Sequence, residues 1–193
     1  MGLIMRRNLM AAGGPSKIPY IAFDTSGCNV KFPAGFIGVY GNSVEIEMTV
    51  DRYTNSYIFG YDAGNWAQFR TDGRVNIRNT YTQKSYGIGE IHRYIHTAGS
   101  DVFVIDDETI IVSLGAWLVR NTSNLFIGGY SGGQSNLVGK VLSVINKDPN
   151  GNILHDYRPY SEGGVVGFKD TVTGDIVTNG LDGTLVYGEL DAA

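Results

Sequence analysis

Short apolar runs separated by turn residues recur along almost the whole chain, and this pattern limits the fold more than any other feature. From Tyr20 onward, runs rich in β-branched and aromatic residues follow one another about every 8 to 12 residues. Between them lie clusters of glycine, asparagine and aspartate, such as Asp62–Asn65 and Thr71–Arg74, which are typical of tight turns. The 27 glycines have no fixed period, which excludes a collagen-like chain. The pattern predicts many short strands in a single β-sandwich domain.

Segment 43–50 is the clearest strand, because apolar and polar residues alternate strictly along it. Successive side chains of a strand point to opposite faces of the sheet. We therefore expect one face in the core and the other in water. The inward set is Val44, Ile46, Met48 and Val50, and the outward set is Glu45, Glu47 and Thr49.

Charge and cysteine content exclude several classes of function. The net charge of −4, the pI near 5.3 and the scattered lysines and arginines argue against the basic face that nucleic-acid binding requires. The single cysteine, Cys28, allows neither an internal disulfide nor a cysteine-based zinc site. No run approaches the roughly 18 apolar residues of a membrane-spanning helix. We expect neither nucleic acid nor membrane insertion, and residues 1–12 do not fit a signal peptide.

Four consecutive pieces of the last third carry a family resemblance: 125–129, 140–146, 157–160 and 165–179. Their order resembles the C-terminal half of the concanavalin A-like (laminin G-like) jelly-roll domains found in head and tail proteins of bacteriophages and prophages. The last piece, VVGFKDTVTGDIVTN, is similar to the hairpin that ends this fold, with Phe168 and Lys169 where the family has Leu and Tyr. The resemblance extends more diffusely over residues 20–187.

The resemblance implies an all-β jelly-roll sandwich and a non-catalytic virion component. The expected role is head decoration, head fibre or tail association, in a protein made in the host bacterial cytoplasm and located in the virion. Other virion subunits are the expected partners, with host surface glycans as further ligands and several copies on each particle. The alternatives from other classes are a jelly-roll glycoside hydrolase and a bacterial cell-surface lectin.

Residues 1–18 differ from the rest of the chain because they show no strand alternation. Arg6, Arg7, Leu9 and Met10 combine charge with flexible apolar side chains just before Gly13-Gly14-Pro15. Such a sequence neither propagates a helix nor pairs readily as a strand. We expect a short extended N-terminal arm that contacts another subunit, followed by the jelly-roll domain over residues 19–193.

Aromatic residues beside the expected turns are candidates for sugar binding. An exposed ring can cover the apolar face of a sugar, while neighbouring amide groups bond its hydroxyls. The same rings also suit a sandwich core or a subunit contact. The candidate glycan-binding residues are Tyr61, Asn65, Trp66, Tyr130 and Gln134.

Two patterns suggest enzymes but lack essential parts. Glu45 and Glu47 lie on one strand face, and paired carboxylates can hydrolyse glycosidic bonds. Related jelly-roll glucanases carry a third acid on that strand, where this chain has Val50 on the apolar face. The segment 129–133 matches the G-x-S-x-G pattern, but another strand follows where the nucleophile elbow needs a helix. We therefore expect no catalytic residues.

Metal ligation has little support from the sequence. His92 and His96 are about 13 Å apart along a strand, too far to share one metal ion. Together with Tyr94 they are expected to lie on an exposed strand face. The acidic turn 106–108 offers oxygen ligands without a known spacing, so calcium stays open as an alternative to no cofactor.

Overall fold

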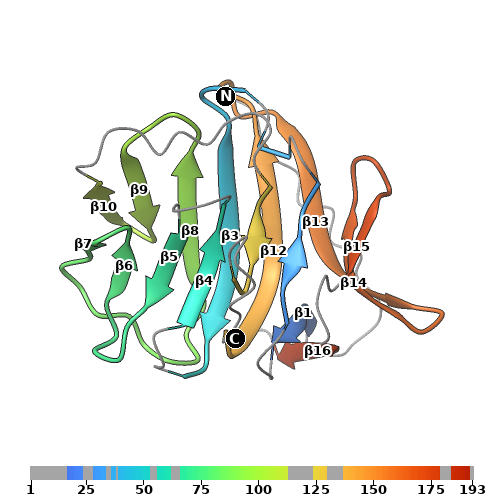
Figure 1. The fold of residues 1–193 in the computed structure, drawn as a ribbon. Helices are drawn as coiled ribbons and strands as arrows, with labels where there is room; N and C mark the ends of the chain where they lie inside the picture. Colours follow the sequence, from blue (N-terminus) through green and yellow to red (C-terminus); the bar gives the residue numbers. More distant parts are fainter. Residues whose placement is uncertain are drawn as a thin grey trace.

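The computed structural model describes residues 17–23, 28–33, 36–37, 39–52, 56–61, 66–112, 124–129, 137–178 and 184–191. Across these ranges the regular secondary structure consists of β-strands and includes no helix. Accordingly, none of the described segments is a helix that could span a membrane. The strands form two antiparallel sheets that face each other (Figure 1).

The larger sheet has the spatial order β10-β9-β8-β3-β12-β13-β14-β15, and β1 pairs with both β12 and β16. Its strands are β1 (Lys17–Phe23), β3 (Ser43–Val50), β8 (His92–Thr97), β9 (Val102–Ile105), β10 (Glu108–Ile111), β12 (Gly139–Lys147), β13 (Ile153–Glu162), β14 (Val165–Asp170), β15 (Ile176–Thr178) and β16 (Leu185–Asp191). The central strand β3 pairs with β12, which lies about ninety residues further along the chain. Non-local pairing of this kind is what closes a sandwich.

The smaller sheet has the order β2-β11-β4-β5-β6-β7 and lies in front of the larger one in Figure 1. Its strands are β2 (Val30–Lys31), β4 (Ser56–Gly60), β5 (Trp66–Phe69), β6 (Val75–Ile77), β7 (Thr80–Tyr81) and β11 (Phe126–Ile127). The turn expected at residues 71–74 is confirmed, since it lies between β5 and β6. The predicted all-β jelly-roll sandwich is likewise confirmed.

Aromatic rings join the two sheets through the core. Phe59 of β4 stacks on Phe103 of β9, with ring centroids 5.6 Å apart and ring planes at 9°. Phe32, just after β2, meets Tyr157 of β13 edge-on at 5.0 Å. Each of these rings is at most 1% exposed. The core therefore fills the space between the sheets, and Cys28 lies buried in it, where its thiol donates to the carbonyl of Thr184 at 3.1 Å.

Strand β3 confirms the predicted alternation. Its even-numbered residues from Val44 to Val50 are at most 2% exposed. On the other face, Glu45 and Glu47 are only partly covered. Thr49 is the exception on that face, because it is buried and its hydroxyl donates to Asp51.

The last third contains two hairpins, one of which is the hairpin predicted by the resemblance. Residues 148–152 join β12 to β13, and Gly151 takes a positive φ of 86° there. Strands β14 and β15 pair from Gly167 opposite Thr178 to Lys169 opposite Ile176. The resemblance at residues 165–178 therefore describes the hairpin correctly.

The expected boundary of the N-terminal arm needs a small correction. Lys17 and Ile18 belong to β1, where they pair with Asp191 and Leu190 of β16. The sandwich therefore includes residues 17 and 18. The expected contact residues, Arg6, Arg7, Leu9 and Met10, lie outside the described residues.

Candidate functional site

Of the five residues predicted to bind a glycan, two lie within the described residues. Trp66 begins β5 and is half-buried, and its ring meets Tyr57 edge-on with centroids 5.6 Å apart. Tyr61 follows β4. The remaining three, Asn65, Tyr130 and Gln134, lie outside the described residues.

Tyr61 is not available for sugar binding, because it takes the alternative place in the sandwich core. Tyr61 is 0% exposed, and its hydroxyl lies 3.3 Å from Nδ1 of His96. Burial raises the pKa of Tyr61 and lowers the pKa of His96 to about 3, so both side chains stay neutral. Tyr61 lies at the end of β4, where the opposite sheet covers it, and it belongs to the core.

The expectation of an exposed face on β8 is wrong. His92, Tyr94 and His96 are at most 6% exposed. The register with β3 explains why, because they pair with residues of its inward face. These partners are, in the same order, Met48, Ile46 and Val44. A polar-aromatic surface for a ligand therefore does not exist on this strand.

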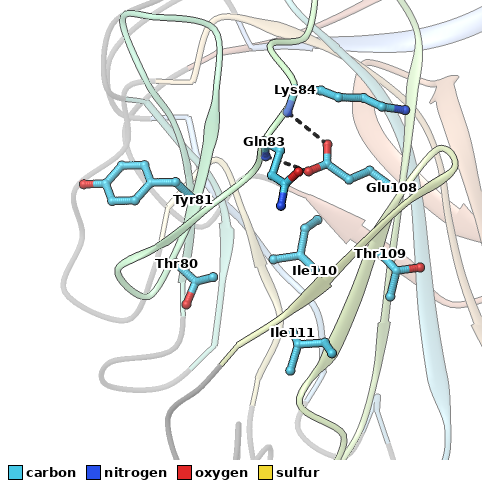
Figure 2. A pocket seen from close by; sticks show the side chains of 8 residues that line it. All are labelled: Thr80, Tyr81, Gln83, Lys84, Glu108, Thr109, Ile110 and Ile111. Carbon is cyan, nitrogen blue, oxygen red and sulfur yellow. Dashed lines mark hydrogen bonds between the residues drawn. The ribbon is translucent and has the colours of Figure 1, made fainter.

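A pocket of about 290 Å³ lies between β7 and β10 (Figure 2). Strand β7 ends the smaller sheet and β10 ends the larger sheet. The pocket thus opens at the side of the sandwich where both sheets stop. Its lining residues are Thr80, Tyr81, Gln83, Lys84, Glu108, Thr109, Ile110 and Ile111.

Glu108 fastens one wall of this pocket to the other. Its carboxylate accepts the backbone N–H of Gln83 at 2.7 Å and, more weakly, that of Lys84 at 3.4 Å (dashed in Figure 2). The Tyr86 hydroxyl donates to the same carboxylate at 2.7 Å. Burial, together with Glu108, raises the pKa of Tyr86, so the hydroxyl keeps its proton. These bonds hold the loop after β7 against β10.

Backbone groups at the outer edge of β10 lie beside the pocket. The Val112 N–H donates to the carbonyl of Asp101. In the antiparallel pair, the backbone N–H and C=O groups of every second residue of β10 therefore point to β9. The N–H and C=O groups of Thr109 and Ile111 consequently face away from β9. No strand of the described residues pairs with this edge. Free backbone groups of this kind can bond hydroxyl groups of a ligand.

An aromatic ring stands at the rim of the pocket. Tyr81 is 44% exposed, and the guanidinium of Arg74 lies 5.3 Å from its ring centre. In Figure 2 this ring extends outward from the rim, whereas the side chain of Gln83 extends toward Ile110. The pocket therefore combines an amide, hydroxyl groups and free backbone with an exposed ring. This combination suits a polyhydroxylated ligand that also has an apolar face.

The acidic turn beside the pocket uses its carboxylates in bonds to the protein. Asp106 binds His92 and the backbone of Arg93, and Asp107 binds Lys84 at 2.8 Å. Within the described ranges, no group of three or more His, Cys, Asp or Glu side chains is arranged to hold a metal ion. The turn therefore gives calcium no preformed cage.

Glu45, one of the paired carboxylates of β3, is a poor candidate for the acid of a glycosidase. Glu45 binds Lys147 at 2.7 Å and Arg93 at 2.6 Å. Burial alone would raise the pKa of Glu45, but the two cations outweigh burial, and the net pKa is lower than usual. An ionised Glu45 is poorly suited to be the general acid that glycoside hydrolysis needs. The third acid of the glucanase pattern is absent, because Val50 is fully buried at that position.

Sequence reasoning missed the residues of the pocket. Segment 80–84 reads Thr-Tyr-Thr-Gln-Lys, which has the same aromatic-beside-amide signature that selected Trp66. That signal was present in the sequence. Its partner, β10, lies more than twenty residues further along the chain, and only the fold brings the two edges together.

Comparisons with known proteins bear on the fold. No family model matches the chain, and no curated protein matches its sequence. A solved structure from Bacteroides ovatus, whose description proposes carbohydrate binding, aligns with a TM-score of 0.58 and 17% identity. The alignment covers 92% of this chain and 62% of that one, so the chain spans less than two thirds of that protein. A heptameric SAP-like pentraxin from Limulus polyphemus aligns with a TM-score of 0.46 and 12% identity, covering 91% of each chain.

Proposed function

We propose that this protein is a non-catalytic carbohydrate-binding jelly-roll protein and that its ligand occupies the pocket between β7 and β10. The observation that carries the proposal is the lining of the pocket. Gln83, Thr80 and the free backbone of Thr109 supply directional bonds, while the exposed Tyr81 ring stands at the rim. Sugars need both kinds of contact.

The fold supports this proposal independently of the lining. The protein from Bacteroides ovatus has the same architecture, and carbohydrate binding is proposed for it. The bonds from Glu108 add a physical reason, because a pocket that is already held together loses little entropy when a ligand binds.

A glycan array tests the proposal, followed by titration of the best ligand with variants. Tyr81→Ala and Gln83→Ala should each weaken binding about tenfold, the effect of losing one well-placed contact. Trp66→Ala is the matched control, since Trp66 lies two strands away on β5 and should bind normally. If the wild-type protein binds no glycan in any form, the proposal fails. If only Trp66→Ala weakens binding, the site lies elsewhere.

The rival enzyme proposal has a separate test. We expect no hydrolysis of β-glucans or other common polysaccharides above the level of a Glu45→Gln/Glu47→Gln double variant. The ion pairs of Glu45 with Lys147 and Arg93 are the reason. Turnover by the wild type that this double variant lacks would show that the protein is a glycosidase.

A virion location is a second proposal, favoured by the similarity of residues 165–179 to the terminal hairpin of phage jelly-roll domains. In this proposal the protein is a multicopy head or tail component made in the host bacterial cytoplasm. Residues 1–16 would join it to another virion subunit through Arg6, Arg7, Leu9 and Met10. Mass spectrometry of purified particles should detect the full chain. A chain that lacks residues 1–16 should be absent from the particles. Normal incorporation of the truncated chain would refute this role for the arm.

A further inference from the structure

His92 lies at the centre of the contacts that hold the pocket walls together. The side chain is nearly buried, with 7% of its surface exposed. Its Nδ1 lies 2.9 Å from a carboxylate oxygen of Asp106, in the turn between β9 and β10. Its Nε2 lies 3.3 Å from the carbonyl oxygen of Gly87, in the loop after β7. The imidazole ring thus bridges the loop to the turn.

Both ring nitrogens therefore face hydrogen-bond acceptors. A neutral imidazole has one N–H, so one of its nitrogens would direct a lone pair at an oxygen atom. Only the protonated ring donates to Asp106 and to Gly87 together. The carboxylate of Glu90, 3.9 Å from Nε2, adds a further negative charge on the same side. The protonated ring can therefore make one more hydrogen bond across the gap between loop and turn than the neutral ring can.

The two segments that His92 bridges are the walls of the pocket. Gly87 follows Tyr86, whose ring meets the His92 ring edge-on at 5.0 Å and whose hydroxyl binds Glu108. Asp106 precedes Glu108 by two residues and takes a positive φ of 52° in the hairpin turn. Its second carboxylate oxygen accepts the backbone N–H of Arg93. A bond lost at His92 therefore loosens the loop and the turn at the same point.

We propose that His92 is a proton-dependent clamp that closes the pocket between β7 and β10 and makes ligand affinity fall as pH rises. The effect on affinity rests on the proposed carbohydrate binding, whereas the clamp itself does not. Histidine is the side chain whose charge ordinarily changes between pH 5 and 8. The titratable groups that face His92 are Asp106, Glu90 and Tyr86, and burial raises the pKa of Tyr86 further from this range.

The clamp can be measured without any ligand. Hydrogen exchange of the Gln83 and Lys84 amides, which Glu108 binds, reports how often the loop opens. Their protection factors in the wild type should fall about tenfold between pH 5.5 and pH 8, the effect of one lost hydrogen bond. His92→Gln should give low protection at both pH values. Asp106→Asn, which suits a positive φ, should also remove the pH dependence.

His155→Gln is the matched control, because His155 binds Asp170 at the far side of the larger sheet. This variant should keep the wild-type fall in protection. A wild-type protection factor that does not change with pH, or a change that survives in both His92→Gln and Asp106→Asn, would overturn the clamp.

Titration of the array-selected glycan at pH 5.5 and pH 8 then separates the two proposals. Stronger binding at pH 5.5 in the wild type, lost in His92→Gln, is the expected result. A pH-dependent clamp in a protein that binds no glycan would contradict the proposed function alone. Glycan binding that is equal at both pH values would contradict the regulation alone.

Discussion

His92 and His155 each bind an aspartate at a hairpin turn, but the two aspartates have different surroundings. Asp170, at the end of β14, is 0% exposed. It accepts His155 Nδ1 at 2.6 Å and two backbone N–H groups, from Asp156 and Val172, at 3.0 Å each. The hydroxyl of Thr173 completes its shell at 2.9 Å. Asp170 thus fixes the turn that follows β14 and also bonds it to β13.

Asp106 is more open to solvent, with 38% of its side chain exposed. It accepts one backbone N–H, from Arg93, in addition to His92. Its histidine is the buried partner, whereas at the other pair the aspartate is buried and 30% of the His155 side chain is exposed. The comparison shows that the buried member of each pair is the one that joins separate segments: Asp170 joins its turn to β13, and His92 joins the loop after β7 to the turn before β10.

The largest expected effect is that of Asp170→Asn on stability. This change should lower the free energy of unfolding by about 2 kcal/mol, because buried bonds to a charged acceptor are worth about 1.5–3 kcal/mol. Asp106→Asn should cost less than about 1 kcal/mol, since asparagine tolerates a positive φ and the side chain is partly solvated. Urea unfolding of both variants at pH 7 measures the difference. Equal losses would show that exposure does not separate the two aspartates.

The second largest expected effect is the loss of stability at acid pH that Asp170 causes. Burial raises the pKa of Asp170, but its hydrogen bonds outweigh burial and lower it. A carboxyl group with a lowered folded-state pKa contributes stability that is present above its unfolded pKa, near 3.9, and is lost as pH falls through the folded pKa. The wild type should therefore lose stability below about pH 4. Asp170→Asn should lose less over the same range, measured by thermal unfolding at each pH. A parallel decline in both proteins would remove Asp170 as the cause.

The Asp170 turn could be predicted from the sequence because its signal is local. Segment 165–178 contains two short runs of β-branched and aromatic residues with Thr-Gly-Asp between them, and Gly174 takes the positive φ of 86° that such a turn requires. The strand 43–50 was equally clear, since strict alternation selects the buried face without knowledge of its neighbours. Both features depend on residues that are adjacent in the chain.

The surroundings of His92 could not be predicted in this way. Segment 92–97 alternates His, Tyr and His with Arg, Ile and Thr, and neither set is clearly apolar. Its register with β3 decides which set is buried. The burial of Tyr61 could not be predicted either, because the opposite sheet covers its ring. The pocket likewise depends on two edges that are distant in sequence. Such features depend on non-local pairing, which a single sequence does not determine.

The smallest expected effect concerns two exposed lysines, one in each region. Lys84 pairs with Asp107 beside the pocket, and Lys169 lies over the ring of Tyr160 on β13. Lys84→Gln and Lys169→Gln should leave the midpoint of thermal unfolding unchanged within error, because an exposed ion pair and an exposed cation–π contact each contribute little to stability. The loop beside Lys84 is held by Glu108 and His92 instead. If Lys84→Gln destabilised the protein as much as Asp106→Asn, and added salt reproduced the loss, the surface ion pair would be what joins the pocket walls.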